Sequence, residues 1–168
     1  VFRLDGGEAV YDAAFPGRVT GAMQRQGGAP VVADVDGDGR AEVGVAGQRA
    51  FAVFDPERGP ATDAVRLRSD HVAVADDHFG FTGAAAFDLD GDGRWEIVHG
   101  DEASLYVLGM PEAAPSGLQV LWSAPKRSAT NSEMPVVADV NADGRADIVA
   151  PNEPRELGEG IPVYSNDA

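Results

Sequence analysis

Three acidic stretches of the sequence share one spacing and could hold a metal ion. They read ADVDGDGRAE (33–42), AFDLDGDGRWE (86–96) and ADVNADGRAD (138–147). Each places acid or amide side chains at loop positions 1, 3 and 5, a glycine at position 6 and another acid at position 9. The side chains are Asp34, Asp36, Asp38 and Glu42 in loop 1, Asp88, Asp90, Asp92 and Glu96 in loop 2, and Asp139, Asn141, Asp143 and Asp147 in loop 3. Carboxylates this dense repel one another unless a cation lies among them.

Ca²⁺ suits these donors, because it is a hard cation that takes six to eight oxygens in irregular geometry. The glycine at position 6 permits the sharp turn around an ion. The backbone carbonyl at position 7 can add a ligand. The residues at position 7 are Arg40, Arg94 and Arg145. The alternative for each loop is an Asp/Gly turn without metal.

An EF-hand is excluded by the end of each loop. That motif needs a bidentate glutamate at position 12 and helices on both sides. Position 12 is Val45, His99 or Ala150 here, and the flanking residues favour strands. The acid at position 9 instead closes the loop early, so that both flanks can be strands.

The elements that position the loops repeat with the loops. Asp34, Asp88 and Asp139 are separated by 88 − 34 = 54 and 139 − 88 = 51 residues, which is the size of one four-stranded propeller blade. A β-prone run enters each loop and an apolar run leaves it, which predicts a hairpin. These paired runs are 31–33 with 43–45, 85–87 with 97–98, and 136–138 with 148–149.

Further strands are predicted at 50–54, 64–68, 104–109 and 118–122, and no window shows helical periodicity. We therefore predict an all-β fold. It is a partial β-propeller of four-stranded antiparallel blades, about three blades' worth, with a calcium loop in the first hairpin of each blade.

We predict that residues 1–168 form a single repeat array, and the phase of the repeat divides this array into units. Residues 1–13 match the third and fourth strands of a blade, and 161–167 match a third strand. The predicted units are the C-terminal half of a preceding blade (1–28), a blade with loop 1 (29–82), a blade with loop 2 (83–133) and a partial blade with loop 3 (134–168). Three blades cannot close a ring. We expect a segment of a longer protein, whose other blades, or further chains, complete the propeller.

Composition narrows the class of partner. The 168 residues are 43% hydrophobic and 24% charged, which is typical of a globular domain. The net charge of −15 argues against nucleic acid and anionic membrane as partners. No apolar run approaches the roughly 18 residues of a spanning helix, so no membrane insertion is expected. The absence of cysteine excludes disulfides and thiolate metal sites.

The pattern D-x-D-G-D-G-x-x-E between two strands resembles the FG-GAP/VCBS repeats of integrin-α-like β-propellers. The segment FGFTGAAAFDLDGDGRWEIVHGD (79–101) carries a Phe-Gly pair and a Gly-Ala-Ala form of the motif that names the family. The resemblance implies about three Ca²⁺ ions, held by the loop residues given above. Loop 3 departs from the pattern at Asn141, Ala142 and Asp147. It is expected to bind with one less negative charge.

These features favour a calcium-binding, non-enzymatic module with a structural, adhesion or ligand-binding role. The module would belong to a larger secreted or surface protein, extracellular or at the cell surface and bacterial in origin. Its ligand would be a protein or a carbohydrate. The two tryptophans, Trp95 and Trp122, lie in strand-like contexts and give no support to a sugar-binding platform.

The alternative is the propeller segment of a polysaccharide lyase or another carbohydrate-active enzyme. Such an enzyme needs an acid–base group outside the metal loops. The candidates are His71, Asp76, Asp77, His78 and His99. Solvated loop positions are the favoured explanation for His71 and His78, and capping or packing beside a strand is the favoured one for His99. No Ser/His/Asp order, phosphate-cradling loop or H-E-x-x-H motif occurs, so no catalytic residue is predicted.

Overall fold

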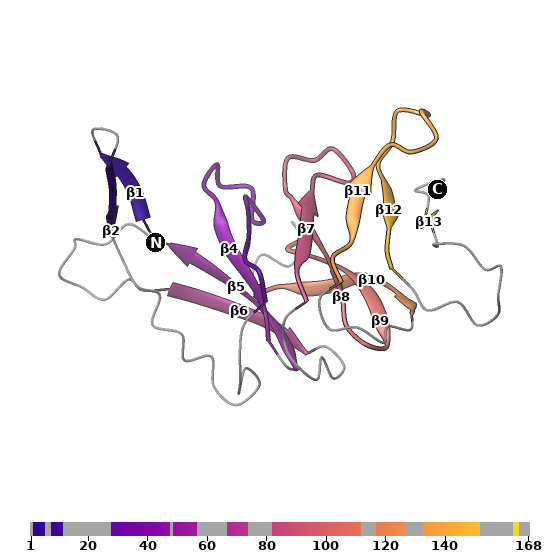
Figure 1. The fold of residues 1–168 in the computed structure, drawn as a ribbon, viewed down its shortest axis with the longest axis horizontal. Helices are drawn as coiled ribbons and strands as arrows, with labels where there is room; N and C mark the ends of the chain where they lie inside the picture. Colours follow the sequence, from indigo (N-terminus) through magenta and orange to yellow (C-terminus); the bar gives the residue numbers. More distant parts are fainter. Residues whose placement is uncertain are drawn as a thin grey trace.

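All regular structure in the described part of the chain is β-strand (Figure 1). The computed structural model describes residues 2–5, 8–11, 28–47, 49–56, 67–73, 82–111, 117–126, 133–151 and 163–164. None of these residues forms a helix long and apolar enough to span a membrane. The predicted all-β class is therefore confirmed.

The strands form antiparallel sheets in which each strand pairs with its neighbour along the chain. An N-terminal hairpin pairs β1 (Phe2–Asp5) with β2 (Glu8–Tyr11). Sheet 1 contains β3 (Val31–Ala33), β4 (Glu42–Ala46), β5 (Ala50–Pro56) and β6 (Leu67–Ala73). Sheet 2 contains β7 (Ala84–Phe87), β8 (Glu96–Gly100), β9 (Ser104–Gly109) and β10 (Gln119–Pro125). Sheet 3 contains β11 (Val136–Ala138), β12 (Asp147–Val149) and β13 (Val163–Tyr164).

Three strands have the bounds that the sequence predicts, namely the first strands of sheets 1 and 3 and the third strand of sheet 2. The run 31–33 forms β3, 104–109 forms β9 and 136–138 forms β11. The fourth strands lie further along the chain than expected: β6 occupies 67–73 instead of 64–68, and β10 occupies 119–125 instead of 118–122. Fourth strands are the hardest to locate, because connections that contain Pro and Gly and share no motif precede them.

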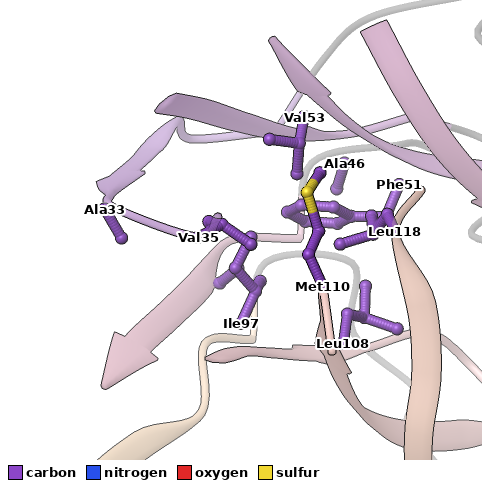
Figure 2. Close-up of a cluster of buried hydrophobic side chains, with 10 residues drawn as sticks. Ala33, Val35, Ala46, Phe51, Val53, Ile97, Leu108, Met110 and Leu118 are labelled. Atoms are coloured by element: carbon purple, nitrogen blue, oxygen red, sulfur yellow. The ribbon is translucent and has the colours of Figure 1, made fainter. Parts of the chain in front are cut away.

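The main core lies between sheets 1 and 2. It contains Phe51 and Val53 from β5, opposite Ile97 of β8 and Leu108 of β9. Figure 2 shows the Phe51 ring in this cluster, beside Met110 and Leu118. Phe51 packs so closely on β4 that a methyl group on Gly44 would lie 2.9 Å from its ring, which explains the glycine in that strand.

A second core lies between sheets 2 and 3. It joins Val98, Leu105 and Val107 of sheet 2 to Ile148 of β12 and to Ala150, which follows that strand. Successive strand residues face opposite sides of a sheet, so Ile97 and Val98 enter different cores, and both are fully buried. Sheet 2 is thus covered on both faces, and the three sheets stack face to face.

Some apolar positions at the ends of this stack stay exposed. Val136 of β11 is 56% exposed, whereas Val31, at the same place in sheet 1, packs against the main core. Val32 of β3 is 61% exposed. The described residues therefore leave apolar surface on the outer sides of sheets 1 and 3.

Strand β10 forms an uncharged edge of sheet 2. Every residue of the strand except Ala124 is exposed, including Val120, Leu121 and Trp122. The register with β9 shifts between Val120 and Trp122, and such a bulge twists an edge strand away from straightforward pairing.

Replacing Phe51 by alanine should destabilise the protein by about 3–5 kcal/mol, because it removes a fully buried ring between two sheets. Urea unfolding followed by far-UV circular dichroism measures the change. Val32→Ala is the matched control and should shift stability by less than about 0.5 kcal/mol, because Val32 is exposed. Equal losses in the two variants would contradict this packing.

Candidate metal centres

The three acidic loops connect the first two strands of their sheets and project at one edge of the molecule. In Figure 1 they stand at the top, above β4, β7 and β11–β12. The acid at position 9 is in each case the first residue of the second strand. Strand pairing places it opposite the last residue of the first strand, so the hairpin brings position 9 back to the mouth of its loop. The pairs are Ala33 with Glu42, Phe87 with Glu96, and Ala138 with Asp147.

Loop 1 is wrapped around its own carboxylates. The Oδ1 atom of Asp34 accepts the backbone N–H groups of Gly37 at 2.8 Å and Asp38 at 3.1 Å, and its Oδ2 accepts that of Gly39 at 2.8 Å. Asp36 Oδ1 accepts the Asp38 N–H at 3.1 Å. These bonds turn the backbone back on itself and gather the acids at one point.

Glu42 closes loop 1 from beneath. Its Oε2 accepts the N–H of Val35 at 2.7 Å, while its Oε1 is buried and accepts no hydrogen bond from the described residues. A buried carboxylate oxygen without a donor is costly. It requires either a proton or a cation.

The loop 1 carboxylates are close enough to share one ion. One oxygen from each of Asp34, Asp36, Asp38 and Glu42 lies within 4.8 Å of the others. Oxygens on opposite sides of a Ca²⁺ ion, each at 2.3–2.6 Å, would be about 5 Å apart. The spacing of these carboxylates therefore fits Ca²⁺, and the unbonded Glu42 Oε1 supplies a buried oxygen that could act as a ligand.

Loop 2 repeats this arrangement. Asp88 accepts the N–H groups of Gly91 at 2.8 Å and Gly93 at 3.1 Å, and Glu96 Oε2 accepts that of Leu89 at 2.8 Å. Asp88, Asp90 and Glu96 form the second group of carboxylates within 4.8 Å of one another. Asp92 accepts the Arg94 N–H at 2.7 Å but lies outside the group.

Loop 3 shares with loops 1 and 2 the backbone bonds that positions 2 and 6 donate to its acids, but its set of acids is looser. Asp139 Oδ2 accepts the Gly144 N–H at 2.9 Å, and Asp147 Oδ2 accepts the Val140 N–H at 3.0 Å. Its acids do not gather into a group of three within the part of the chain that the structure describes. Aspartate at position 9 is one methylene shorter than glutamate, and the Asn141 amide nitrogen donates to Asp143 Oδ2 at 3.0 Å. Asp147 Oδ1 is nevertheless buried and, like the Glu42 oxygen, has no hydrogen-bond partner among the residues that the structure describes.

Position 2 of each loop carries an anchor that the sequence analysis did not single out. Its N–H donates to the acid at position 9, and its side chain is apolar in all three loops: Val35, Leu89 and Val140. Val35 is buried in the main core and Leu89 packs against the second core, whereas Val140 is 54% exposed. The sequence signal that could have revealed this anchor is the apolar residue repeated at position 2 of all three acidic loops.

The position 7 arginines have different surroundings. Arg40 and Arg145 are exposed, and their backbone N–H groups donate to the Oδ1 atoms of Asp38 and Asp143 at 2.8 Å. Arg94 is half-buried, and its Nη1 donates to the carbonyl of Met110 at 3.2 Å.

Burial changes the acidity of the position 9 glutamates. Loss of water, together with the nearby charges of Asp36 and Asp34, raises the pKa of Glu42 to about 7 against the lowering effect of the Val35 backbone N–H. Burial also raises the pKa of Glu96 to about 7, with Asp90 and Asp92 acting in the same direction. At neutral pH the metal-free protein therefore holds a large fraction of each group protonated, and a cation must displace that proton.

The acid–base candidates are not brought together in the described residues. His99 lies within β8, not after a strand, and it is fully buried. Its ring is 5.0 Å from the Phe51 ring and stacks on Tyr106 at 6.4 Å, so it has the packing role that its position suggested. His71 belongs to β6, of whose side chains nothing is described, and Asp76, Asp77 and His78 lie outside the described residues.

The fold and loops define an all-β protein of stacked antiparallel sheets with acidic groups that could hold metal ions. Neither a protein-family model nor a curated protein matches the chain. Among solved structures, the chain is similar to the V. cholerae biofilm matrix protein Bap1, with a TM-score of 0.51 and 24% sequence identity. The match covers 73% of this chain and 19% of that one. The chain thus spans about a fifth of the length of Bap1 and shares the fold of that part.

The raised pKa values predict an unusual pH dependence for the metal-stripped protein. The folded state binds these protons more tightly than the unfolded chain, where the pKa of glutamate is about 4.3. The stabilisation is therefore complete below about pH 4 and is lost as the pH rises through about 7. Thermal melting at a series of pH values should show the melting temperature falling between about pH 5 and pH 8. Glu42→Gln, which is neutral throughout, should flatten that fall, and an unchanged slope would refute the assignment.

Backbone conformation at loop position 4 gives a second prediction. Gly37 and Gly91 have φ of 75° and 78°, whereas loop 3 places Ala142 there at 61°. This left-handed conformation costs an L-residue roughly 1–2 kcal/mol, so Ala142→Gly should stabilise the protein by about 1 kcal/mol. Gly91→Ala is the matched reverse change, because a methyl group there meets open space, and it should destabilise by a similar amount. Chemical denaturation measures both, and changes of the same sign would contradict the argument.

Proposed function

We propose that the chain is a calcium-binding β-propeller segment of the FG-GAP/VCBS type, whose loops hold about three Ca²⁺ ions. The observation that carries the proposal is the Glu42 carboxylate. It is buried, belongs to a group of four acids, and keeps one oxygen without a hydrogen-bond partner among the described residues. A divalent cation would satisfy that oxygen and neutralise the repulsion among the other three acids.

The ligands in each loop would be the side chains at positions 1, 3, 5 and 9 with the carbonyl at position 7. Loop 1 and loop 2 have the closer sets of acids. The buried, unpartnered oxygen of Asp147 supports a third and weaker ion in loop 3. Three divalent ions would change the net charge from −15 to −15 + 6 = −9.

The stacked sheets support the propeller arrangement. Sheets 1 and 2 each have four antiparallel strands in sequential order, and apolar cores join neighbouring sheets in the order of the chain. The exposed Val32 and Val136 mark the faces against which further blades, of this protein or of other chains, would pack. The fold shared with part of Bap1 is consistent with a repeat segment inside a longer protein.

The proposed role is that of a non-enzymatic structural, adhesion or ligand-binding module in a secreted or surface protein of bacteria. Sites of this density suit the millimolar Ca²⁺ outside cells, where modules bind with dissociation constants of about 10⁻⁴–10⁻³ M. The likeness to a biofilm matrix protein supports an extracellular place. A protein or carbohydrate ligand is part of the proposal.

Calcium should stabilise the protein. At a Ca²⁺ concentration ten times the dissociation constant, each filled loop contributes about 1.4 kcal/mol, so the melting temperature should rise clearly over that in chelator. Asp36→Asn should remove the part of the calcium-dependent rise in melting temperature that loop 1 contributes. It should change the melting temperature little in chelator. Glu102→Gln is the control, since it removes the same charge outside the loops and should keep the full response. Equal melting temperatures of the parent protein in calcium and in chelator would refute the proposal.

A further inference from the structure

Loops 1 and 2 are joined directly by their backbones. The N–H of Trp95 in loop 2 donates to the carbonyl of Asp34 in loop 1 at 2.8 Å. Asp34 is the first acid of loop 1, and its side chain accepts three of the backbone N–H groups that shape that loop. Trp95 stands between Arg94 and Glu96, which are two of the proposed ligand residues of loop 2. A single hydrogen bond therefore links the ligand frames of the two loops.

The side chain of Arg94 makes a second link. It lies against Gly37, so closely that a methyl group on Gly37 would be 2.9 Å from Arg94 Cγ and 3.5 Å from Nε. Its guanidinium is held by the carbonyl of Met110, which follows β9 and belongs to the core between sheets 1 and 2. Arg94 is thus fixed at one end by the core and covers the turn of loop 1 with its aliphatic stem.

From these contacts we propose that Arg94 and Trp95 are positioning residues for loop 1, and that loops 1 and 2 bind Ca²⁺ with positive cooperativity. The inference rests on the proposed calcium-binding function. Without a cation, the like charges of loop 2 loosen residues 88–96. A cation removes that repulsion and orders residues 94–96, which then hold Asp34 and Gly37 in the shape that loop 1 needs. Ordering by the first ion lowers the cost of ordering for the second.

Direct repulsion between the two ions acts in the opposite direction. Residues 37–40 and 90–93 of the loops are exposed to solvent, so dissolved salt weakens this repulsion. The contacts of Arg94 and Trp95 are short-range and are not screened. We therefore expect the ordering effect to dominate, and the cooperativity to be at least as strong in 0.5 M salt as in 0.15 M salt.

Site-resolved titration of the 168-residue chain tests the inference. The amide signals of Gly39 and Gly93 report loops 1 and 2 separately, because each N–H is bonded to the first acid of its own loop. In Asp90→Ala, which disables loop 2, the Ca²⁺ midpoint of Gly39 should rise about fivefold or more. In Asp36→Ala, the midpoint of Gly93 should rise by the same factor, since coupling is reciprocal. The control Asn141→Ala in loop 3 should leave the Gly39 midpoint unchanged.

Arg94→Ala separates the link from the ligands, because the residue would contribute only its carbonyl to loop 2. It should raise the Gly39 midpoint more than twofold, and by a larger factor than it changes the midpoint of Gly93 in the Asp36→Ala background. Arg145→Ala, at the same position of loop 3 and exposed, should leave both midpoints as they are. Dispersed amide spectra confirm that each variant is folded.

The possible failures are distinct. If neither glycine signal moves at 10 mM Ca²⁺ in the parent protein, the calcium-binding function itself is wrong and the inference falls with it. If both signals titrate, but the Gly39 midpoint stays within twofold in Asp90→Ala and Arg94→Ala, the loops are independent. The calcium-binding function then stands and the cooperativity is refuted.

Discussion

The acid at position 9 has to satisfy two demands with one carboxylate. In loops 1 and 3 one oxygen accepts the backbone N–H of position 2, which ties the loop to the sheet, and the other oxygen is buried without a hydrogen-bond partner among the described residues. Because the residue at position 9 is the first residue of the second strand, the hairpin cannot form without burying a carboxyl group, either charged or protonated. Strand pairing, loop shape and cation affinity therefore depend on the same group. The anchor residues Val35 and Leu89 extend this dependence into the apolar cores between the sheets.

The sequence was sufficient for the features that repeat. Periodic aspartates located the loops, the apolar runs before loops 1 and 3 located β3 and β11 at their observed bounds, and a separate apolar run located β9. The fourth strands were misplaced, because the connections before β6 and β10 share no motif that marks where the strand begins. His99 could be assigned to packing, but only the structure shows it enclosed by Phe51 and Tyr106, since those neighbours come from other strands.

Differences among the loops were visible in the sequence, but their effects were not. Replacing Glu by Asp at position 9 reads as a conservative change. In the structure it accompanies an open set of acids and an exposed Val140. Contacts between loops were beyond sequence reasoning, because the bond from Trp95 to Asp34 joins backbone atoms of two sheets. A tryptophan in loop 2, where loops 1 and 3 have Ala41 and Ala146, gave no hint of it.

The exposed edge strand β10 connects the net negative charge of the protein to its solubility. An exposed, uncharged strand at the edge of a sheet is a template for pairing with another molecule, and strong net charge of one sign keeps such edges apart. If the loops bind calcium as proposed, each ion would lower the net negative charge of the protein by two units. Ions that stabilise one molecule would then also weaken the repulsion between different molecules. Solubility and fold stability would respond to the same metal in opposite directions, and protein concentration would become a variable in any measurement made with calcium.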